Sequence, residues 1–175
     1  MDHDSLYETD ICTWADQQAA ALRSLASRSD LPNQLDLMNI VEEIEDVGSS
    51  HFNAVNSFIR LILSHMILII FDQDADSVPH SKAEVATFHA ELLQRYQPSM
   101  RQRVDVDLLW RRALREAHAK LAAYRRDESL VILERVRMAL GLSCPIDVDE
   151  VCDENFEVND AIDRLRNRLS MEPSG

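Results

Sequence analysis

Glycine and proline are scarce in this chain, at 3 and 5 of 175 residues. A β-rich fold needs many tight turns, and tight turns recruit glycine and proline, so this scarcity argues against one. Alanine, leucine, glutamate and arginine are abundant instead, which favours long helices. No repeat of 20–50 residues is visible, which argues against a solenoid. We therefore predict an all-α fold, a compact bundle of about five to six helices forming one domain over residues 1–170, with a frayed tail at 171–175.

Cysteine is also sparse and odd in number, with Cys12, Cys144 and Cys152 only. The chain has no CxxC pair or Cys/His cluster that would suggest zinc. Three cysteines in a chain without a signal peptide fit a reducing cytosol better than a disulfide framework. We expect a cytoplasmic protein.

Catalytic signatures are missing as well. There is no nucleophile elbow, phosphate-binding loop or dinucleotide fingerprint, and three glycines could hardly build them. We expect no cofactor. The leading hypothesis is a protein-interaction or regulatory module without catalytic activity.

The net charge of −13 is unevenly distributed. It is −12 over residues 1–91, +5 over 101–126 and −7 over 127–175. The acidic net charge argues against broad electrostatic binding to nucleic acid or to an anionic membrane surface. We expect the basic segment to pair with acidic helices of the same chain or of a second copy.

The stretch from Phe58 to Phe71 is apolar except at Arg60, Ser64 and His65. A membrane span wants about 20 apolar residues, so this stretch predicts a buried helix at the middle of the fold. Ile67 and Phe71 lie opposite the main apolar stripe, which means that the helix needs cover on several sides. Other helices or a partner subunit could supply it. Ile67 and Phe71 are therefore our candidates for an interaction surface, and a homo-oligomer is the expected assembly.

Upstream of this stretch the apolar stripe keeps its helical phase through Gly48. We therefore favour one helix over 36–72, with two helices joined at Gly48 as the alternative. Further helices are expected at 6–27, 77–97, 107–126, 130–140, 147–153 and 159–169, with Gly141 as a C-cap.

An acidic block of Glu42, Glu43, Glu45 and Asp46 lies near the start of this helix. It suggests a second hypothesis, that the chain is a carboxylate/histidine metal-binding protein or enzyme. Bundle metal sites combine inward glutamates with Glu-x-x-His pairs, and no such pair occurs here. The candidates would be Glu43, Glu45 and His65. We favour instead a solvated acidic rim and a neutral core histidine. The aspartates at 72, 74 and 76 mimic a calcium loop, but later loop positions do not fit.

Arg111 and Arg115 lie on one face of the predicted helix over 107–126. This face could meet phosphates, so a nucleic-acid-associated protein is the third hypothesis. Interleaved exposed aromatics are lacking, which favours ion pairing with carboxylates instead.

Three stretches of the chain, beginning at Tyr7, Glu42 and Cys144, together resemble a known family. The chain is similar to the bacterial family named domain of unknown function twenty-nine, over most of residues 5–156. The resemblance implies an all-helical fold and no established activity. The family usually follows its histidine with lysine and tryptophan, where Met66 and Ile67 stand here, and has a Ser-Trp pair where residues 79–81 stand. The matching motifs are Tyr7–Asp10 with Trp14, Gln17-Gln18 and Ala21–Arg23; Glu42–Gly48 with His65; Cys144–Ile146; and Val151–Phe156.

Overall fold

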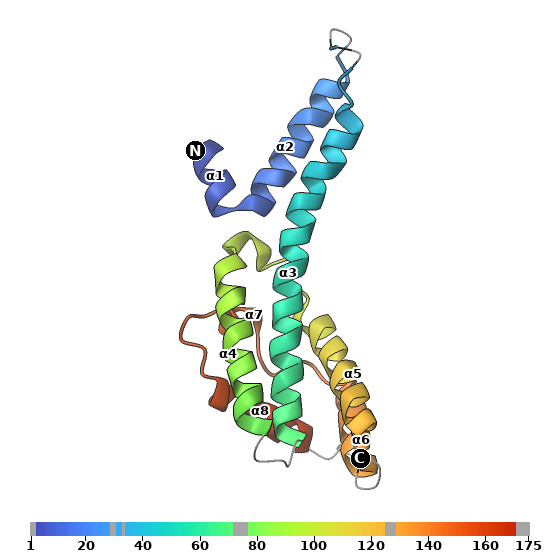
Figure 1. Ribbon diagram of the computed structural model, residues 1–175, viewed down its shortest axis with the longest axis vertical. Coiled ribbons are helices and arrows are strands. Elements are labelled where there is room, and N and C mark those ends of the chain that lie inside the picture. Colours follow the sequence, from blue (N-terminus) through green and yellow to red (C-terminus); the bar gives the residue numbers. More distant parts are fainter. Residues whose placement is uncertain (1–2, 29–30, 33, 72–76, 125–128, 171–175) are drawn as a thin grey trace. The chain divides into compact units, whose positions relative to one another are not determined.

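The computed structural model describes residues 3–28, 31–32, 34–71, 77–124 and 129–170, and these contain helices and no strand. The predicted all-α class with a long central helix is confirmed (Figure 1). Six of the helices have eleven or more residues. The aspartates at 72, 74 and 76 and the tail at 171–175 lie outside the described residues. In order, the elements are α1 (His3–Thr9), α2 (Ile11–Ala26), α3 (Leu37–Phe71), α4 (Ser77–Arg95), the 3-10 helix η1 (Pro98–Met100), α5 (Val106–Tyr124), α6 (Ser129–Ala139), α7 (Val148–Val151) and α8 (Val158–Ser170).

The chain divides into two compact units. Unit 1 comprises Met1–Val55 and Arg95–Arg103, and unit 2 comprises Asn56–Gln94 and Val104–Gly175. The 35-residue α3 contributes its first part to unit 1 and its second part to unit 2. The single domain expected over residues 1–170 stays a prediction.

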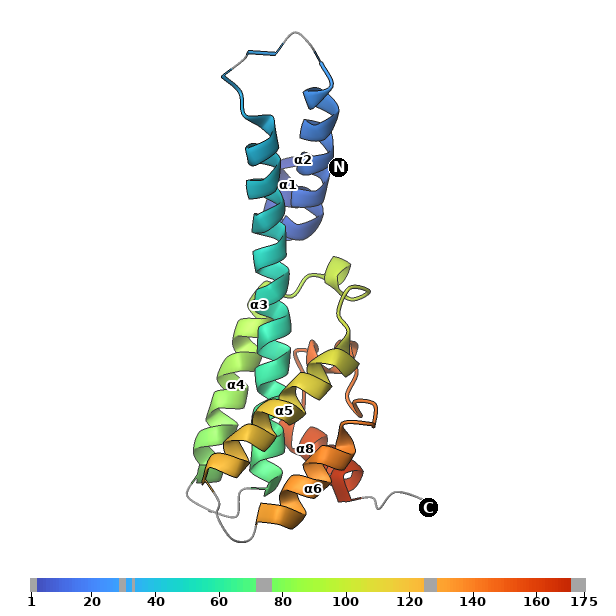
Figure 2. The ribbon, with the colours of Figure 1, turned by 90° about the vertical axis from the view of Figure 1, so that its right-hand side faces the viewer.

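In unit 1, α2 and the first part of α3 run antiparallel as a helical hairpin (Figures 1 and 2). Gly48 does not break α3, so one helix replaces the two-helix alternative. A Cβ at Gly48 would lie 3.0 Å from the Cβ of Ala15, and the Cys12 thiol donates to the Gly48 carbonyl at 3.3 Å. The missing side chain of Gly48 therefore lets the two helices approach closely.

The predicted helix over 6–27 is wrong in one respect, because it is two helices separated at Asp10. The backbone of Asp10 leaves the helical region, with φ −152° and ψ 77°, and its carboxylate accepts from the Thr13 amide at 2.9 Å as the N-cap of α2. The Tyr7 and Trp14 rings meet edge to face at 4.8 Å, which holds α1 on α2. A short polar side chain that can cap a helix thus overrides the apolar periodicity at this point.

In unit 2 the apolar stretch of α3 is the core, as predicted. Its side chains are buried, α4 and α5 lie on either side of it in Figure 1, and α5 crosses it in Figure 2. Trp110 and Leu114 of α5 are also fully buried. Arg60 of α3 forms an ion pair with Glu116 of α5. The fully covered residues of the stretch are Ile59, Ile62, Leu63, Ser64, Met66 and Ile67.

Aspartate carboxylates position the C-terminal helices. Two of them cap helix N-termini, and a third joins α5 to the α6–α7 connection. Asp105 accepts from the Leu108 amide at the start of α5, and Asp147 accepts from the Glu150 amide at the start of α7, each at 2.8 Å. Asp107 accepts from the Cys144 amide at 2.7 Å and ties the α6–α7 connection to α5. Gly141 lies just beyond the end of α6, the position predicted for a C-cap. No described glycine has positive φ, and α6 ends in a 3-10 turn through Gly141 N–H and Met138 O.

Candidate functional site

Ile67 and Phe71, the predicted interaction residues, are 0% and 7% exposed. The sequence allowed either other helices of the chain or a second subunit to cover these side chains. Other helices of unit 2 cover them. These two side chains therefore offer no apolar surface to a partner.

Exposed apolar side chains gather instead on the hairpin of unit 1. Leu25 and Ile40 are each 37% exposed and Val47 is 47% exposed, while Leu22 and Ile44 are half-buried. We call these five residues the hairpin face.

The hairpin face lies on one side of the two helices. At about 100° per residue, Ile40, Ile44 and Val47 precede the buried line of α3 by about 70°. Leu22 and Leu25 precede the buried line of α2 by about 80° in the same rotational sense. In an antiparallel pair, equal rotation about each axis turns both sets toward the same side. The result is one apolar strip that spans two helices.

Charges border this strip on one edge only. Asp36, which accepts from Asn39, and Glu43 flank the α3 edge at the same helical spacing. On the opposite side of the hairpin, Arg23 of α2 forms an ion pair with Glu45 of α3. That pair and the shared buried line of small residues join α2 to α3 on the side away from the exposed part of the strip.

The metal candidates are not brought together. Glu43 is exposed, Glu45 pairs with Arg23, and His65 belongs to unit 2. Among the residues that the structure describes, no group of three or more His, Cys, Asp or Glu side chains could hold a metal ion. No observation favours the metal-binding hypothesis.

His65 lies in an enclosed environment. Its Nδ1 is 3.1 Å from Glu84 Oε2, and its ring meets Phe88 edge to face at 5.3 Å. Burial lowers the pKa of His65, while the Glu84 carboxylate acts in the opposite direction and Lys120 acts with burial. This is the environment of a neutral, packed histidine.

The three thiols are free but poorly suited to chemistry. Burial raises the pKa of Cys144 and of Cys152 to about 12, and it also raises the pKa of Cys12. A nucleophilic or metal-binding cysteine must ionise near neutral pH. Burial therefore leaves none of the three thiols poised as a nucleophile.

Arg115 lies at a pocket that sequence reasoning missed. α5 packs on α6, and between them is a pocket of about 230 Å³ with an apolar floor of Leu114, Val136 and Leu140. Arg115, His118 and Arg137 complete the lining, whereas Arg111 is not part of it. The sequence could not reveal the pocket because residues from two helices must meet to form it. From the sequence, the helical periodicity shows only which residues share a face of one helix, and it does not show which faces meet.

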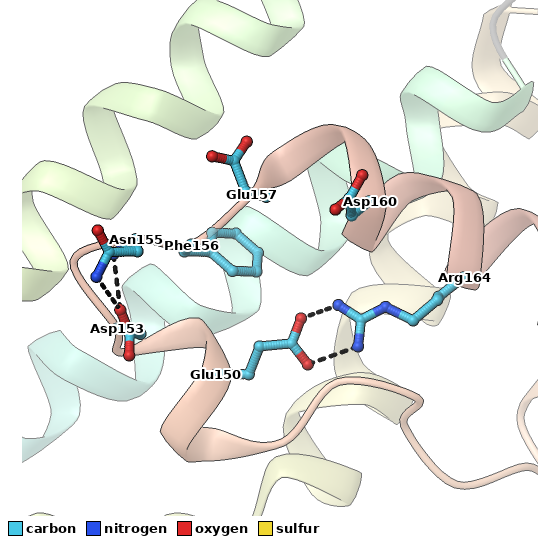
Figure 3. A pocket seen from close by; sticks show the side chains of 7 residues that line it. All are labelled: Glu150, Asp153, Asn155, Phe156, Glu157, Asp160 and Arg164. Carbon is cyan, nitrogen blue, oxygen red and sulfur yellow. Dashed lines mark hydrogen bonds and ion pairs between the residues drawn. The ribbon is translucent and has the colours of Figure 1, made fainter.

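A second hollow of about 380 Å³ lies against α7 and α8 (Figure 3). Arg164 and Glu150 form a two-pronged ion pair across it, and the ring of Phe156 lies between the surrounding carboxylates. The Phe156 ring also contacts His89 of α4 at 5.2 Å. Asp153 accepts from the Asn155 amide at 2.7 Å, which closes the turn. The residues 151–156 thus hold the turn between α7 and α8 against α4, through the contact of Phe156 with His89.

α3 is also long and apolar enough to cross a membrane by length and composition alone. Half of its most apolar 18-residue window is buried within the protein, and the core helix of a water-soluble protein passes the same test. Length and composition therefore do not assign α3 to a membrane.

Comparisons with known proteins agree with the helical fold. A family model described as domain of unknown function DUF29 matches residues 6–157. The chain is also similar to a crystal structure of an α-helical protein of unknown function from Rhodospirillum rubrum, with 34% sequence identity and a TM-score of 0.76. The similarity covers 91% of this chain and 96% of that chain. No curated protein matches the sequence.

Proposed function

Because this chain belongs to the family described as domain of unknown function DUF29, whose description assigns no activity, we propose a function from its own surfaces. We propose that it is a protein-interaction module that self-associates through the hairpin face. The observation that supports this proposal is the row of exposed and half-buried apolar side chains on one side of a two-helix hairpin.

Two helices alone bury little apolar surface. The line shared by α2 and α3 consists of small residues such as Cys12, Ala15 and Gly48, which bring the helices close but leave their larger neighbours uncovered. Burying an exposed leucine, isoleucine or valine stabilises by about 1.5–3 kcal/mol. A second hairpin placed face to face would cover all five residues and complete a four-helix arrangement.

A two-fold dimer satisfies this need with a single surface, because the same patch is used by both copies. The proposed place of action is the cytoplasm. Three free thiols favour a reducing compartment, where cysteines remain unpaired.

Sedimentation velocity over about 1–200 µM tests the proposal. We expect reversible, concentration-dependent dimers, and we expect Val47→Ser and Leu25→Ser each to raise the dissociation constant about tenfold or more. Removing an apolar contact at an interface core has an effect of this size.

Met38→Ser is the matched control. Met38 is 64% exposed on the same helix, but it points about 160° away from Ile40. It should dimerise like the unmodified chain. A protein that stays monomeric throughout the range would contradict the proposal, as would equal weakening by the control and by Val47→Ser.

A further inference from the structure

The α5–α6 pocket has features of a binding site that are independent of the hairpin face, since it lies wholly in unit 2. Its floor consists of Leu114 and Val136, which are fully buried, and of Leu140, which is half-buried. The rim is polar and cationic. An apolar floor with a few polar groups converging on it is the usual construction of a recognition pocket.

The cations at the rim differ in their availability. Arg137 is engaged by the Glu134 carboxylate one turn earlier on α6, with Nε to Oε2 at 2.8 Å. Arg115 is exposed, and among the described residues no carboxylate pairs with it. An arginine left without an anion at the mouth of an apolar pocket can receive a carboxylate from a partner.

Apolar surface continues from the pocket along α6. Leu130 is 80% exposed, and the half-buried Leu133 and Leu140 lie on the same side of α6, with the charged Arg137 between them. Residues at spacings of three and four form one ridge on a helix. The ridge leads from the N-terminal turn of α6 to the pocket, a geometry that suits a helix laid along it.

The size of the pocket limits its occupant. At about 230 Å³ it is smaller than the roughly 300–1,000 Å³ of typical small-molecule and cofactor sites. It is large enough for one apolar side chain. We propose that the α5–α6 pocket binds an acidic amphipathic helix of a partner protein, with one apolar side chain in the pocket and a carboxylate on Arg115.

Charge and apolar content together favour this occupant over nucleic acid. α5 carries four basic residues against the acids Asp107 and Glu116, a net charge of +2, which complements an acidic partner. A phosphate backbone would use the arginine but would leave the partly exposed side chain of Leu140 without an apolar contact. Base stacking needs exposed aromatic rings, and Trp110 of α5 is buried.

Fluorescence anisotropy of the full chain with labelled 16-residue peptides tests the proposal. One peptide carries leucines on a single helical face with glutamates beside them. A second has the same composition with the leucines scattered around the helix, and a third has lysine in place of glutamate. We expect only the first to bind, and we expect Arg115→Gln to weaken its binding about tenfold or more.

Arg135→Gln is the matched control, because Arg135 is exposed on α6 but does not line the pocket. The charge reversal Arg115→Glu should transfer binding from the acidic peptide to the lysine peptide.

Three outcomes would overturn the proposal. The first is the absence of acidic-peptide binding up to 1 mM. The second is equal binding of the scattered peptide, and the third is equal loss in the Arg115 and Arg135 variants. Arg115-dependent binding of single-stranded RNA in preference to every peptide would also overturn it, in favour of a nucleic-acid site.

Discussion

His65 and His89 are held by packing in an environment that disfavours their charged form. Burial lowers the pKa of both rings below 6.5. For His65 the Glu84 carboxylate opposes burial, while Lys120 and His80 reinforce it. For His89 hydrogen bonds to the backbone of Asp153 and Val151 oppose burial.

These pKa values predict acid sensitivity. A histidine in the unfolded chain has a pKa of about 6.5, so the folded protein binds these protons less well than the unfolded chain does. The stability that neutral His65 and His89 contribute is present in full above about pH 6.5. It is lost as the pH falls from there toward the lower pKa values of the folded state.

Urea unfolding at pH 7.5, 6.5 and 5.5 measures this effect. We expect the unfolding free energy to fall with pH, and we expect the fall to be smaller when both His65 and His89 are replaced by glutamine. Parallel pH profiles for the two proteins would show that other groups are responsible.

Asp107 lies in the first turn of α5, but its carboxylate does not cap that helix and instead accepts a hydrogen bond from a distant segment. Two aspartates, Asp105 and Asp107, stand at the start of α5, and Asp105 caps the helix. Asp107 is thereby free to accept from the Cys144 amide, 37 positions later in the chain. A capping preference is local, whereas this second bond depends on where the α6–α7 connection returns.

At the scale of the element, the α2–α3 hairpin depends on one glycine. Gly48 lies within α3, where glycine costs about 1 kcal/mol relative to alanine. The chain retains this cost because a methyl group at Gly48 would lie 3.0 Å from the Ala15 methyl group. Both carbons are attached to rigid helices, so neither can rotate away.

Gly48→Ala should therefore fail to raise the melting temperature despite its better helix propensity, and Gly48→Val should lower it further. Circular dichroism during heating measures both. Adding Ala15→Gly to Gly48→Ala should recover part of the loss.

Gly141→Ala is the control. The nearest atom to its added methyl group would be Met138 O at 3.8 Å, and its φ is not positive. It should be neutral. If Gly48→Ala stabilised the protein by the full propensity difference, the close helix contact would be refuted.

At the scale of the whole molecule, the net charge of −13 acts differently on the two proposed surfaces. Asp36 and Glu43 border the hairpin face, so a face-to-face dimer brings like charges together. The α5–α6 pocket instead uses attraction between opposite charges. Salt screens both effects, because the Debye length falls from roughly 14 Å at 50 mM to about 4 Å at 500 mM.

Raising sodium chloride from 50 to 500 mM should therefore strengthen self-association and weaken binding of the acidic peptide. Sedimentation and anisotropy at the two concentrations measure the two responses. Glu43→Gln should reduce the salt dependence of self-association alone. Dimers that dissociate as salt rises would indicate an interface held by attraction between opposite charges rather than by the hairpin face.

Much of the fold could be predicted from local signals. The run over 58–71 predicted a buried central helix because a strip of isoleucine and leucine must avoid water on every side. The capping pattern at Asp147 predicted the start of α7 because its hydrogen bond spans only three residues. The break at Asp10 was missed because the apolar periodicity continues across it.

The candidate surfaces were beyond such reasoning. The amino-acid sequence by itself determined an all-helical chain, a central helix that needs cover and an uneven charge. Only the tertiary structure decided that Ile67 and Phe71 are covered from within, that Ile40 and Val47 remain exposed, and that Arg115 borders a pocket. The physical reason is that periodicity records which side of a helix is apolar, whereas exposure depends on which other segment packs against that side.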